Sequence, residues 1–190
     1  MNLYLALLHY PVYNKNGEVV TTAITGFDLH DIARSAMTFG VKKYFVVNPV
    51  AAQLKFAERI VAAWAEAESF VQNWTRAKAL ARLSLQKDLD NVILEIENET
   101  GKLPSLVATS ARPKGALSYA AFRGKMAAQE GQPWLLLFGT GWGMTDEILQ
   151  RCDYVLEPIA GADQDNYNHL SVRSAVAIIL DRLMGRPDAN

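Results

Sequence analysis

Residues 135–149, LLLFGTGWGMTDEIL, combine an apolar run, a glycine-rich turn and the polar start of a helix. The first four residues have the composition of a buried strand. Glycines then follow at every second position, at Gly139, Gly141 and Gly143. A strand that passes through such a turn into a helix is typical of α/β folds, in which ligands bind beyond the carboxyl ends of the strands.

This glycine turn matches neither of the common phosphate-binding patterns. Met144 stands where the dinucleotide pattern has its third glycine, and no lysine follows the last glycine as in a P-loop. Thr145 is expected to cap the next helix, so that Asp146 and Glu147 would occupy its first turn and repel a phosphate. The turn therefore favours a ligand with little negative charge, such as S-adenosylmethionine. A tight turn without a ligand is the alternative.

Strands and helices alternate over the rest of the chain. Apolar runs predict strands at residues 3–8, 43–48, 105–113, 134–138 and 154–159, and a weaker one at 77–85. Helical spacing predicts helices at residues 28–40, 51–74, 86–101, 117–131 and 169–185. Asp28 is expected to cap the first of these helices, with Gly40 as its stop, and Gly131 is expected to end the fourth. Residues 9–20, with Pro11 and the sequence NKNG, are expected to form a loop.

This alternation implies an α/β fold with a mostly parallel sheet and helices on both faces. At 190 residues the chain has the usual size of one domain, so residues 1–190 are expected to form a single unit. We find no internal repeat and no linker.

Composition and charge exclude several classes of protein. Lysine and arginine number 19 against 20 acidic residues, so a polyanion must be bound by a local patch. The single cysteine, Cys152, excludes an internal disulfide and a cysteine-based zinc site, and it is expected to be a buried, inert thiol. No segment has the ~20 apolar residues of a membrane span, and no basic start precedes the first strand. We therefore expect a cytoplasmic protein without membrane association.

The segment 161–169 is rich in aspartate and asparagine and enters an apolar helix directly. Such residues fold into compact turns, and a polar loop of this length in a small domain is typical of a functional site. A metal site at Asp163, Asp165 and His169 is an alternative that lacks the spacing and the terminal glutamate of a calcium loop. No metal is therefore expected.

Three segments, taken in order, resemble the motifs of the SPOUT class of S-adenosylmethionine-dependent RNA methyltransferases. Residues 28–49 are similar to the first motif, with Asp28 in place of its usual asparagine and Arg34 matching its arginine. The segment 135–149 is similar to the second motif, and residues 156–183 to the third. The pattern most resembles a small bacterial SPOUT family that also occurs joined to a tRNA guanine-N1 methyltransferase domain.

The resemblance implies a C-terminal deep trefoil knot, formed when residues 160–184 thread through an earlier loop. It also implies a homodimer with the cofactor pocket near the subunit interface, and S-adenosylhomocysteine as the product. A structured RNA, tRNA or rRNA, would be the substrate, and a tRNA methyltransferase would be a partner protein.

The resemblance also assigns site residues. Those that would bind the cofactor are Thr109, Ser110, Ala111, Phe138, Gly139, Thr140, Gly141, Gly143, Ile159, Gly161, Asn168, Leu170, Ser171 and Val172. Arg34 would contact an RNA phosphate or polarise the acceptor, with a surface arginine as the alternative. Asp28 would act as a general base or only as a helix cap. Further RNA contacts would come from Arg112 and from a basic patch of Lys42, Lys43, Lys114, Arg123 and Lys125.

Two other functions compete with a methyltransferase. A non-catalytic module would bind the cofactor or RNA in support of a partner enzyme. A nucleotide-binding hydrolase or oxidoreductase would require a phosphate at the glycine turn, which the acidic helix start disfavours.

Overall fold

The computed structural model describes residues 1–66, 74–109, 116–162 and 169–186. Its centre is a six-stranded sheet in the order β5-β4-β1-β7-β6-β8, with every adjacent pair parallel. The strands are β1 (Asn2–Leu8), β4 (Tyr44–Val47), β5 (Leu83–Gln86), β6 (Ser105–Thr109), β7 (Pro133–Gly139) and β8 (Tyr154–Leu156). The predicted α/β fold with a parallel sheet is confirmed.

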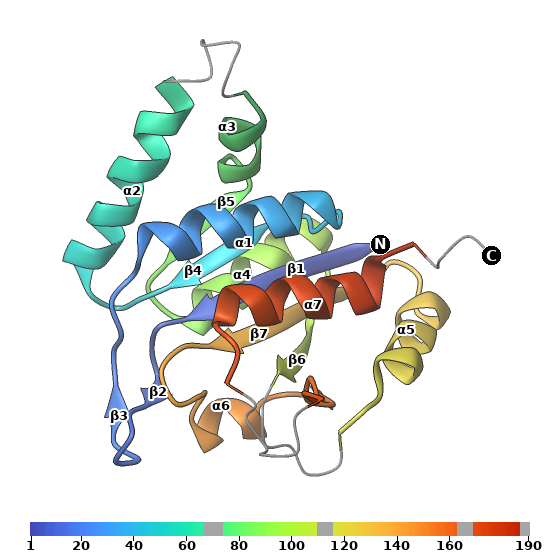
Figure 1. Cartoon of the computed structure of the whole chain (residues 1–190). Coiled ribbons are helices and arrows are strands. Elements are labelled where there is room, and N and C mark those ends of the chain that lie inside the picture. Colours follow the sequence, from blue (N-terminus) through green and yellow to red (C-terminus); the bar gives the residue numbers. More distant parts are fainter. Residues whose placement is uncertain (67–73, 110–115, 163–168, 187–190) are drawn as a thin grey trace.

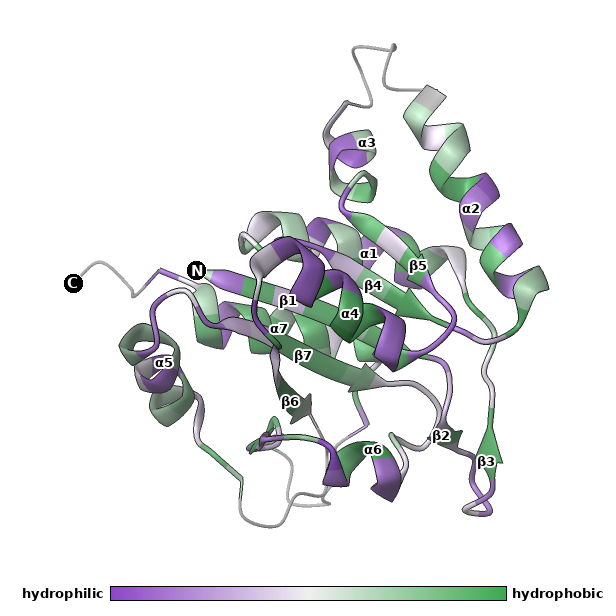
Figure 2. Cartoon of the chain, turned by 180° about the vertical axis from the view of Figure 1, so that it is seen from behind, coloured by the Kyte–Doolittle hydropathy of each residue, from purple (hydrophilic) through white to green (hydrophobic). Residues whose placement is uncertain are grey.

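Helices cover both faces of this sheet (Figures 1 and 2). The face toward the viewer in Figure 1, here called the front face, carries α1 (Gly26–Thr38), α5 (Tyr119–Ala128) and α7 (Val172–Met184). The back face carries α4 (Leu89–Thr100) and the short α6 (Asp146–Gln150). Two more helices, α2 (Ala51–Glu66) and α3 (Trp74–Leu80), project beyond β5 and pack against the front core, α2 with Ala57 and Ile60 and α3 with Leu80.

The central strands explain why the core has two halves. Leu3, Leu5 and Leu7 of β1 pack with the front helices, and the alternate residues of the strand pack with α4 and α6. This alternation follows from the two-residue period of a strand. All six apolar residues from Leu3 to Leu8 are buried, as expected for a strand with helices on both faces.

Four local predictions are wrong. Thr25, and not Asp28, caps α1, because the helix begins at Gly26, two residues before the predicted start. Residues 77–80 belong to helix α3, where Ala77 and Leu80 are buried at helical spacing, and only 83–86 form the weak strand. Helix α5 ends at Ala128, before Gly131. The expected loop after β1 contains the hairpin of β2 (Val12–Tyr13) and β3 (Val19–Val20).

The trefoil knot stays a prediction, because residues 163–168, in the connection from β8 to α7, lie outside the described residues. Within the described ranges, no helix is both long enough and apolar enough to cross a membrane.

Candidate functional site

The residues 139–144, here called the glycine loop, leave β7 beside the carboxyl end of β1. Gly139 is the register partner of Leu8. The backbone N–H of Thr140 donates to the Leu8 carbonyl at 3.1 Å, and the Thr140 hydroxyl donates to the same oxygen at 3.1 Å. The first turn of the loop is thereby fixed to the central strand pair.

The outer part of the glycine loop is fixed to β2. Tyr13 N–H donates to the Gly143 carbonyl, and Trp142 N–H donates to the Tyr13 carbonyl, each at 2.9 Å. An isolated antiparallel bridge joins Val12 to Met144 next to them. The hairpin that the sequence analysis missed is therefore the support of this loop.

Glycine stands at these three positions for different physical reasons. A Cβ on Gly139 would lie 2.8 Å from the Met144 backbone nitrogen, and one on Gly141 would lie 2.8 Å from the Tyr13 carbonyl oxygen. Gly141 and Gly143 also have φ values of +60° and +108°, which residues other than glycine rarely adopt. Gly139 and Gly141 are therefore required because other backbone atoms lie too close for a side chain. A Cβ on Gly143 would meet nothing within 4 Å.

The loop side chains differ in exposure. Phe138 is buried in the front core, so its side chain packs inside the protein and anchors the start of the glycine loop. Thr140 is half-buried, and Trp142 is 62% exposed at the tip of the loop. A ligand at this edge of the sheet would meet main-chain groups and a large aromatic surface.

Helix α6 starts with Asp146 and Glu147 in its first turn, as predicted. Thr145 occupies the N-cap position, but its hydroxyl makes no capping hydrogen bond, which corrects the expected cap. This hydroxyl is buried and has no hydrogen-bond partner among the described residues. The two carboxylates nevertheless make this helix start unfavourable for a phosphate.

The turn that leads into α7 forms the second side of the candidate site. Ser171 caps α7 and accepts from Ser174 N–H at 3.2 Å. Ile159 and Val172 are half-buried against the front core, whereas Leu170 is 45% exposed and Gly161 is exposed. The apolar side chains of this turn offer a surface on which a flat aromatic ring would pack.

The third predicted loop is only partly described. Thr109 ends β6, and its hydroxyl donates to the Leu137 carbonyl at 2.8 Å. The other predicted residues of this loop, and one of the last turn, lie outside the described residues: Ser110, Ala111, Arg112, Lys114 and Asn168.

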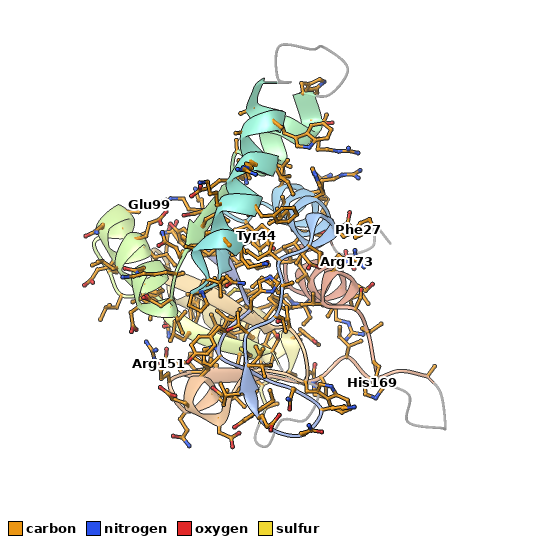
Figure 3. All side chains as sticks on the ribbon, turned by 90° about the vertical axis from the view of Figure 1, so that its left-hand side faces the viewer. Phe27, Tyr44, Glu99, Arg151, His169 and Arg173 are labelled. Atoms are coloured by element: carbon orange, nitrogen blue, oxygen red, sulfur yellow. The ribbon has the colours of Figure 1, made fainter. Side chains whose placement is uncertain are left out.

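Asp28 lies in the first turn of α1, at the same edge of the sheet. Its carboxylate accepts from the Thr25 hydroxyl at 2.6 Å, and the Thr25 hydroxyl accepts from Asp28 N–H at 3.2 Å. Asp28 is buried, and the guanidinium of Arg173 on α7 lies 3.8 Å from its Oδ1. The same guanidinium lies 3.6 Å from Asp31 and 5.2 Å from the centre of the Phe27 ring. Phe27 and Arg173 are labelled in Figure 3.

Arg34 lies on the exposed face of α1, about 9 Å along the helix axis from Asp28. It lines a shallow hollow of about 390 Å³ together with Asp31, Ser35, Thr38 and Phe39. The structure therefore separates Arg34 from Asp28, although the sequence motif links them. A solvent-facing guanidinium suits contact with a large anionic ligand.

Lys42 and Lys43 precede β4, at the opposite edge of the sheet from the glycine loop. Lys42 N–H donates to the Leu3 carbonyl near the start of β1. The Lys43 ammonium lies 2.8 Å from Glu95 and 3.0 Å from Glu99. Although partial burial opposes it, these bonds raise the pKa of Lys43 and compensate its charge.

Three functional candidates escaped the sequence analysis: Arg173, His9 and Thr22. Arg173 follows the predicted cofactor turn directly, but nothing in the sequence pairs it with Asp28. His9 directly follows β1, which is a signal of position that the sequence analysis did not use.

Two other expectations concern metal and thiol chemistry. The described residues contain no group of three or more His, Cys, Asp or Glu side chains able to hold a metal ion. Burial raises the pKa of the Cys152 thiol to about 11, and its Sγ donates to the Ile148 carbonyl at 3.2 Å. This thiol is protonated and unreactive near neutral pH.

Comparison with known proteins identifies the family. A family model described as SAM-dependent RNA methyltransferase matches residues 2–185. An uncharacterized protein from Aquifex aeolicus (strain VF5) is 42% identical over 186 residues, which cover 97% of this chain and 89% of that protein. The chain therefore belongs to the family of S-adenosylmethionine-dependent RNA methyltransferases. The enzyme class and the SPOUT resemblance are confirmed.

A second relative is a longer protein than this chain. A tRNA (guanine-N(1)-)-methyltransferase of Oleidesulfovibrio alaskensis is 40% identical over 184 residues. The match covers 97% of this chain and 42% of that protein, so the chain spans less than half of this relative.

Solved structures confirm the fold. A putative methylase family protein from Neisseria gonorrhoeae superposes with a TM-score of 0.64 at 18% identity, over 100% of this chain and 84% of that chain. The SpoU methyltransferase AviRb from Streptomyces viridochromogenes, solved in complex with AdoMet, gives 0.55 at 18% identity, over 96% and 56%.

Proposed function

We propose that this chain binds S-adenosylmethionine between the glycine loop and the turn into α7, and transfers the methyl group to a nucleotide of a structured RNA, either tRNA or rRNA. The observation that carries this proposal is the family match over residues 2–185, which includes every loop at this edge. The AdoMet in the AviRb structure supports the choice of cofactor.

The residues at this edge fit such a cofactor. Leu170 and Ile159 supply an apolar surface for an adenine ring, and Gly143 leaves space at the backbone. Asp146 and Glu147 disfavour a phosphate-bearing cofactor in the same place. By their motif positions, Thr109, Ser110, Ala111 and Asn168 belong to the same proposed pocket.

Bound S-adenosylmethionine would supply an electrophilic methyl group. The protein must hold the acceptor atom in line with this group and assist the departure of the acceptor's proton. Arg34 is proposed to hold an RNA phosphate from its exposed position on α1. The bonds of Asp28 to Thr25 and Arg173 favour a role in orienting the start of α1 over proton transfer.

A homodimer with the pocket at the subunit interface belongs to this proposal. Phe27, Trp142 and Leu170 lie on the three segments that surround the edge and are 70%, 62% and 45% exposed. Apolar side chains with this exposure favour a protein partner. The longer relative named tRNA (guanine-N(1)-)-methyltransferase supports a partnership with such an enzyme, in the cytoplasm where RNA is modified.

That same relative favours a second candidate function, in which this segment binds the cofactor or RNA without catalysing transfer. Incubation with methyl-tritiated S-adenosylmethionine and total RNA from a strain lacking the gene separates the two candidates. Label in an RNA band that Arg34→Ala abolishes, with cofactor affinity unchanged, is expected for the enzyme. Cofactor binding without label in any RNA would support the module instead.

A further inference from the structure

His9 directly follows β1, the strand beside β7 in the sheet, and is 1% exposed. Leu3, Leu5 and Leu7 of this strand face the front core, so His9 continues this set toward α1 and α7. It therefore lies at the carboxyl edge of the sheet, under the helix starts that carry Asp28 and the proposed cofactor turn. The proposed function gives it no role.

A row of hydrogen bonds leads from His9 to the glycine loop. His9 Nδ1 lies 2.9 Å from the Thr22 hydroxyl oxygen. That oxygen lies 2.5 Å from the Thr140 hydroxyl oxygen, and the Thr140 hydroxyl is 3.1 Å from the Leu8 carbonyl oxygen. Three segments distant in sequence are thus joined at one point.

The last acceptor sets the direction of every bond in the row. A carbonyl oxygen only accepts, so the Thr140 hydroxyl must donate to Leu8. When all three bonds form together, Thr140 accepts a hydrogen bond from the Thr22 hydroxyl, and Thr22 in turn accepts one from His9 Nδ1–H. In this arrangement the imidazole is the Nδ1–H tautomer, with a bare lone pair on Nε2.

Two further observations support a fixed neutral imidazole. Burial lowers the pKa of His9 to about 4, even though the negative charge of Asp28 opposes this shift. Thr22 is itself held by its main chain, since its N–H donates to the His9 carbonyl at 2.9 Å and its carbonyl accepts from Asn48 Nδ2 at 3.1 Å.

The buried Nε2 atom has no hydrogen-bond partner among the described residues. A buried acceptor without a donor opposes folding. An apolar side chain of similar size would avoid this cost if His9 only filled space. The donor at Nδ1 is therefore the part of the imidazole that the fold uses.

We propose that His9 is a positioning residue, which sets the conformation of the glycine loop through the relay His9–Thr22–Thr140. This role rests on the proposed function, because the glycine loop is taken as one wall of the cofactor site. His9 acts through Thr140 and does not itself touch the reacting atoms.

The tautomer provides the first test. Long-range ¹H–¹⁵N spectra of the uniformly labelled protein, without cofactor, distinguish a protonated Nδ1 from a protonated Nε2. The relay predicts a protonated Nδ1 for His9 in the wild type and loss of this single tautomer in Thr22→Val. Thr100→Val is the matched control, because its hydroxyl donates to the Ile96 carbonyl on the back face and takes no part in the relay. A protonated Nε2 in the wild type would overturn the direction of the relay.

Calorimetric titration with S-adenosylmethionine tests the positioning role. Thr22→Val and His9→Leu are expected to weaken binding about tenfold or more, the usual effect of a lost buried hydrogen bond. Thr22→Ser keeps the hydroxyl, and His9→Asn keeps an N–H donor near the Nδ1 position, so both are expected to bind within about threefold of wild type. Thermal unfolding confirms that each variant is folded.

Three outcomes are distinguishable in this titration. If the wild type binds but Thr22→Val and folded His9→Leu bind equally well, the positioning role is wrong. If Thr22→Ser and His9→Asn bind as weakly as Thr22→Val and His9→Leu, the loss of the hydrogen bonds is not the cause of the weaker binding. If the wild type does not bind S-adenosylmethionine, the proposed function fails and the positioning role with it, whereas the tautomer still decides the relay.

Discussion

Arg173 Nε lies 3.8 Å from Asp28 Oδ1, and this ion pair joins the first turn of α7 to the first turn of α1. Both helix starts lie at the carboxyl edge of the sheet, where Leu170, Ser171 and Val172 immediately precede Arg173. The side chain of Arg173 thus connects the proposed cofactor turn to the helix that carries Arg34.

Replacement of Arg173 by glutamine is expected to weaken cofactor binding more than it lowers stability. The Arg173 side chain is 33% exposed, so loss of its ion pairs should cost about 1 kcal/mol or less in unfolding free energy. The turn into α7 would lose its tie to α1, and the affinity for S-adenosylmethionine should fall about fivefold or more. Arg182→Gln on the same helix, which removes a cation–π contact with Tyr119, is the control and should leave affinity unchanged. Equal effects of the two substitutions on this affinity would contradict a role of Arg173 in the cofactor site.

Gly141→Ala tests whether the glycine loop needs its close approach to β2. A Cβ at this position would meet the Tyr13 carbonyl oxygen at 2.8 Å and would require φ of +60°. We expect a loss of about 1–3 kcal/mol in unfolding free energy and a clear loss of cofactor affinity. Gly124→Ala is the matched control, since it lies in α5 with open space around its Cβ and should be neutral or slightly stabilising. Chemical denaturation and calorimetry provide both numbers.

The buried His9 predicts a loss of stability in acid. Burial lowers its pKa from 6.5 to about 4, so between these values the unfolded chain binds a proton that the folded chain does not. The contribution is fully present above about pH 6.5 and is lost as the pH falls toward 4, by about 3 kcal/mol. Urea unfolding of wild type and His9→Asn at pH 7.5, 5.5 and 4.5 measures this term as the difference between the two proteins. A difference that stays constant with pH would contradict the prediction.

Arg34 and Lys43 should respond differently to replacement by alanine. Arg34 is exposed and lines a hollow, so Arg34→Ala is expected to lower RNA affinity and the salt dependence of binding, with little effect on stability. Lys43 is held by Glu95 and Glu99, so Lys43→Ala is expected to cost about 1 kcal/mol or less in stability and to leave RNA binding unchanged. RNA filter binding at several salt concentrations, with unfolding curves, compares them. A larger RNA defect in Lys43→Ala would place the RNA at the opposite edge of the sheet.

The sequence was sufficient for the architecture because the buried parallel strands are continuous apolar runs with helical patterns between them. The order of those elements implies a parallel sheet and a ligand at its carboxyl edge. Predicted helix boundaries were wrong where a polar residue outside the apolar pattern determines the boundary, as Thr25 does at the start of α1.

The hairpin after β1 could not be predicted, because β2 and β3 have only two residues each, and β2 is held in addition by the glycine loop, which is distant in sequence. The candidate site was predicted as three loops, and the glycine loop and the turn into α7 lie at the expected edge. Its internal bonds could not be predicted. The Asp28–Arg173 pair and the His9–Thr22–Thr140 relay join residues far apart in sequence, and no periodicity encodes such contacts.

The most direct test of the central claim is isothermal titration of the purified chain with S-adenosylmethionine and S-adenosylhomocysteine, with NADH and ATP as controls. The proposed cofactor site at the glycine loop, beside an acidic helix start, predicts binding of the first two at about micromolar Kd, near −8 kcal/mol, and none of the phosphate-bearing pair. Preference for NADH or ATP, or no binding of S-adenosylmethionine, would contradict it.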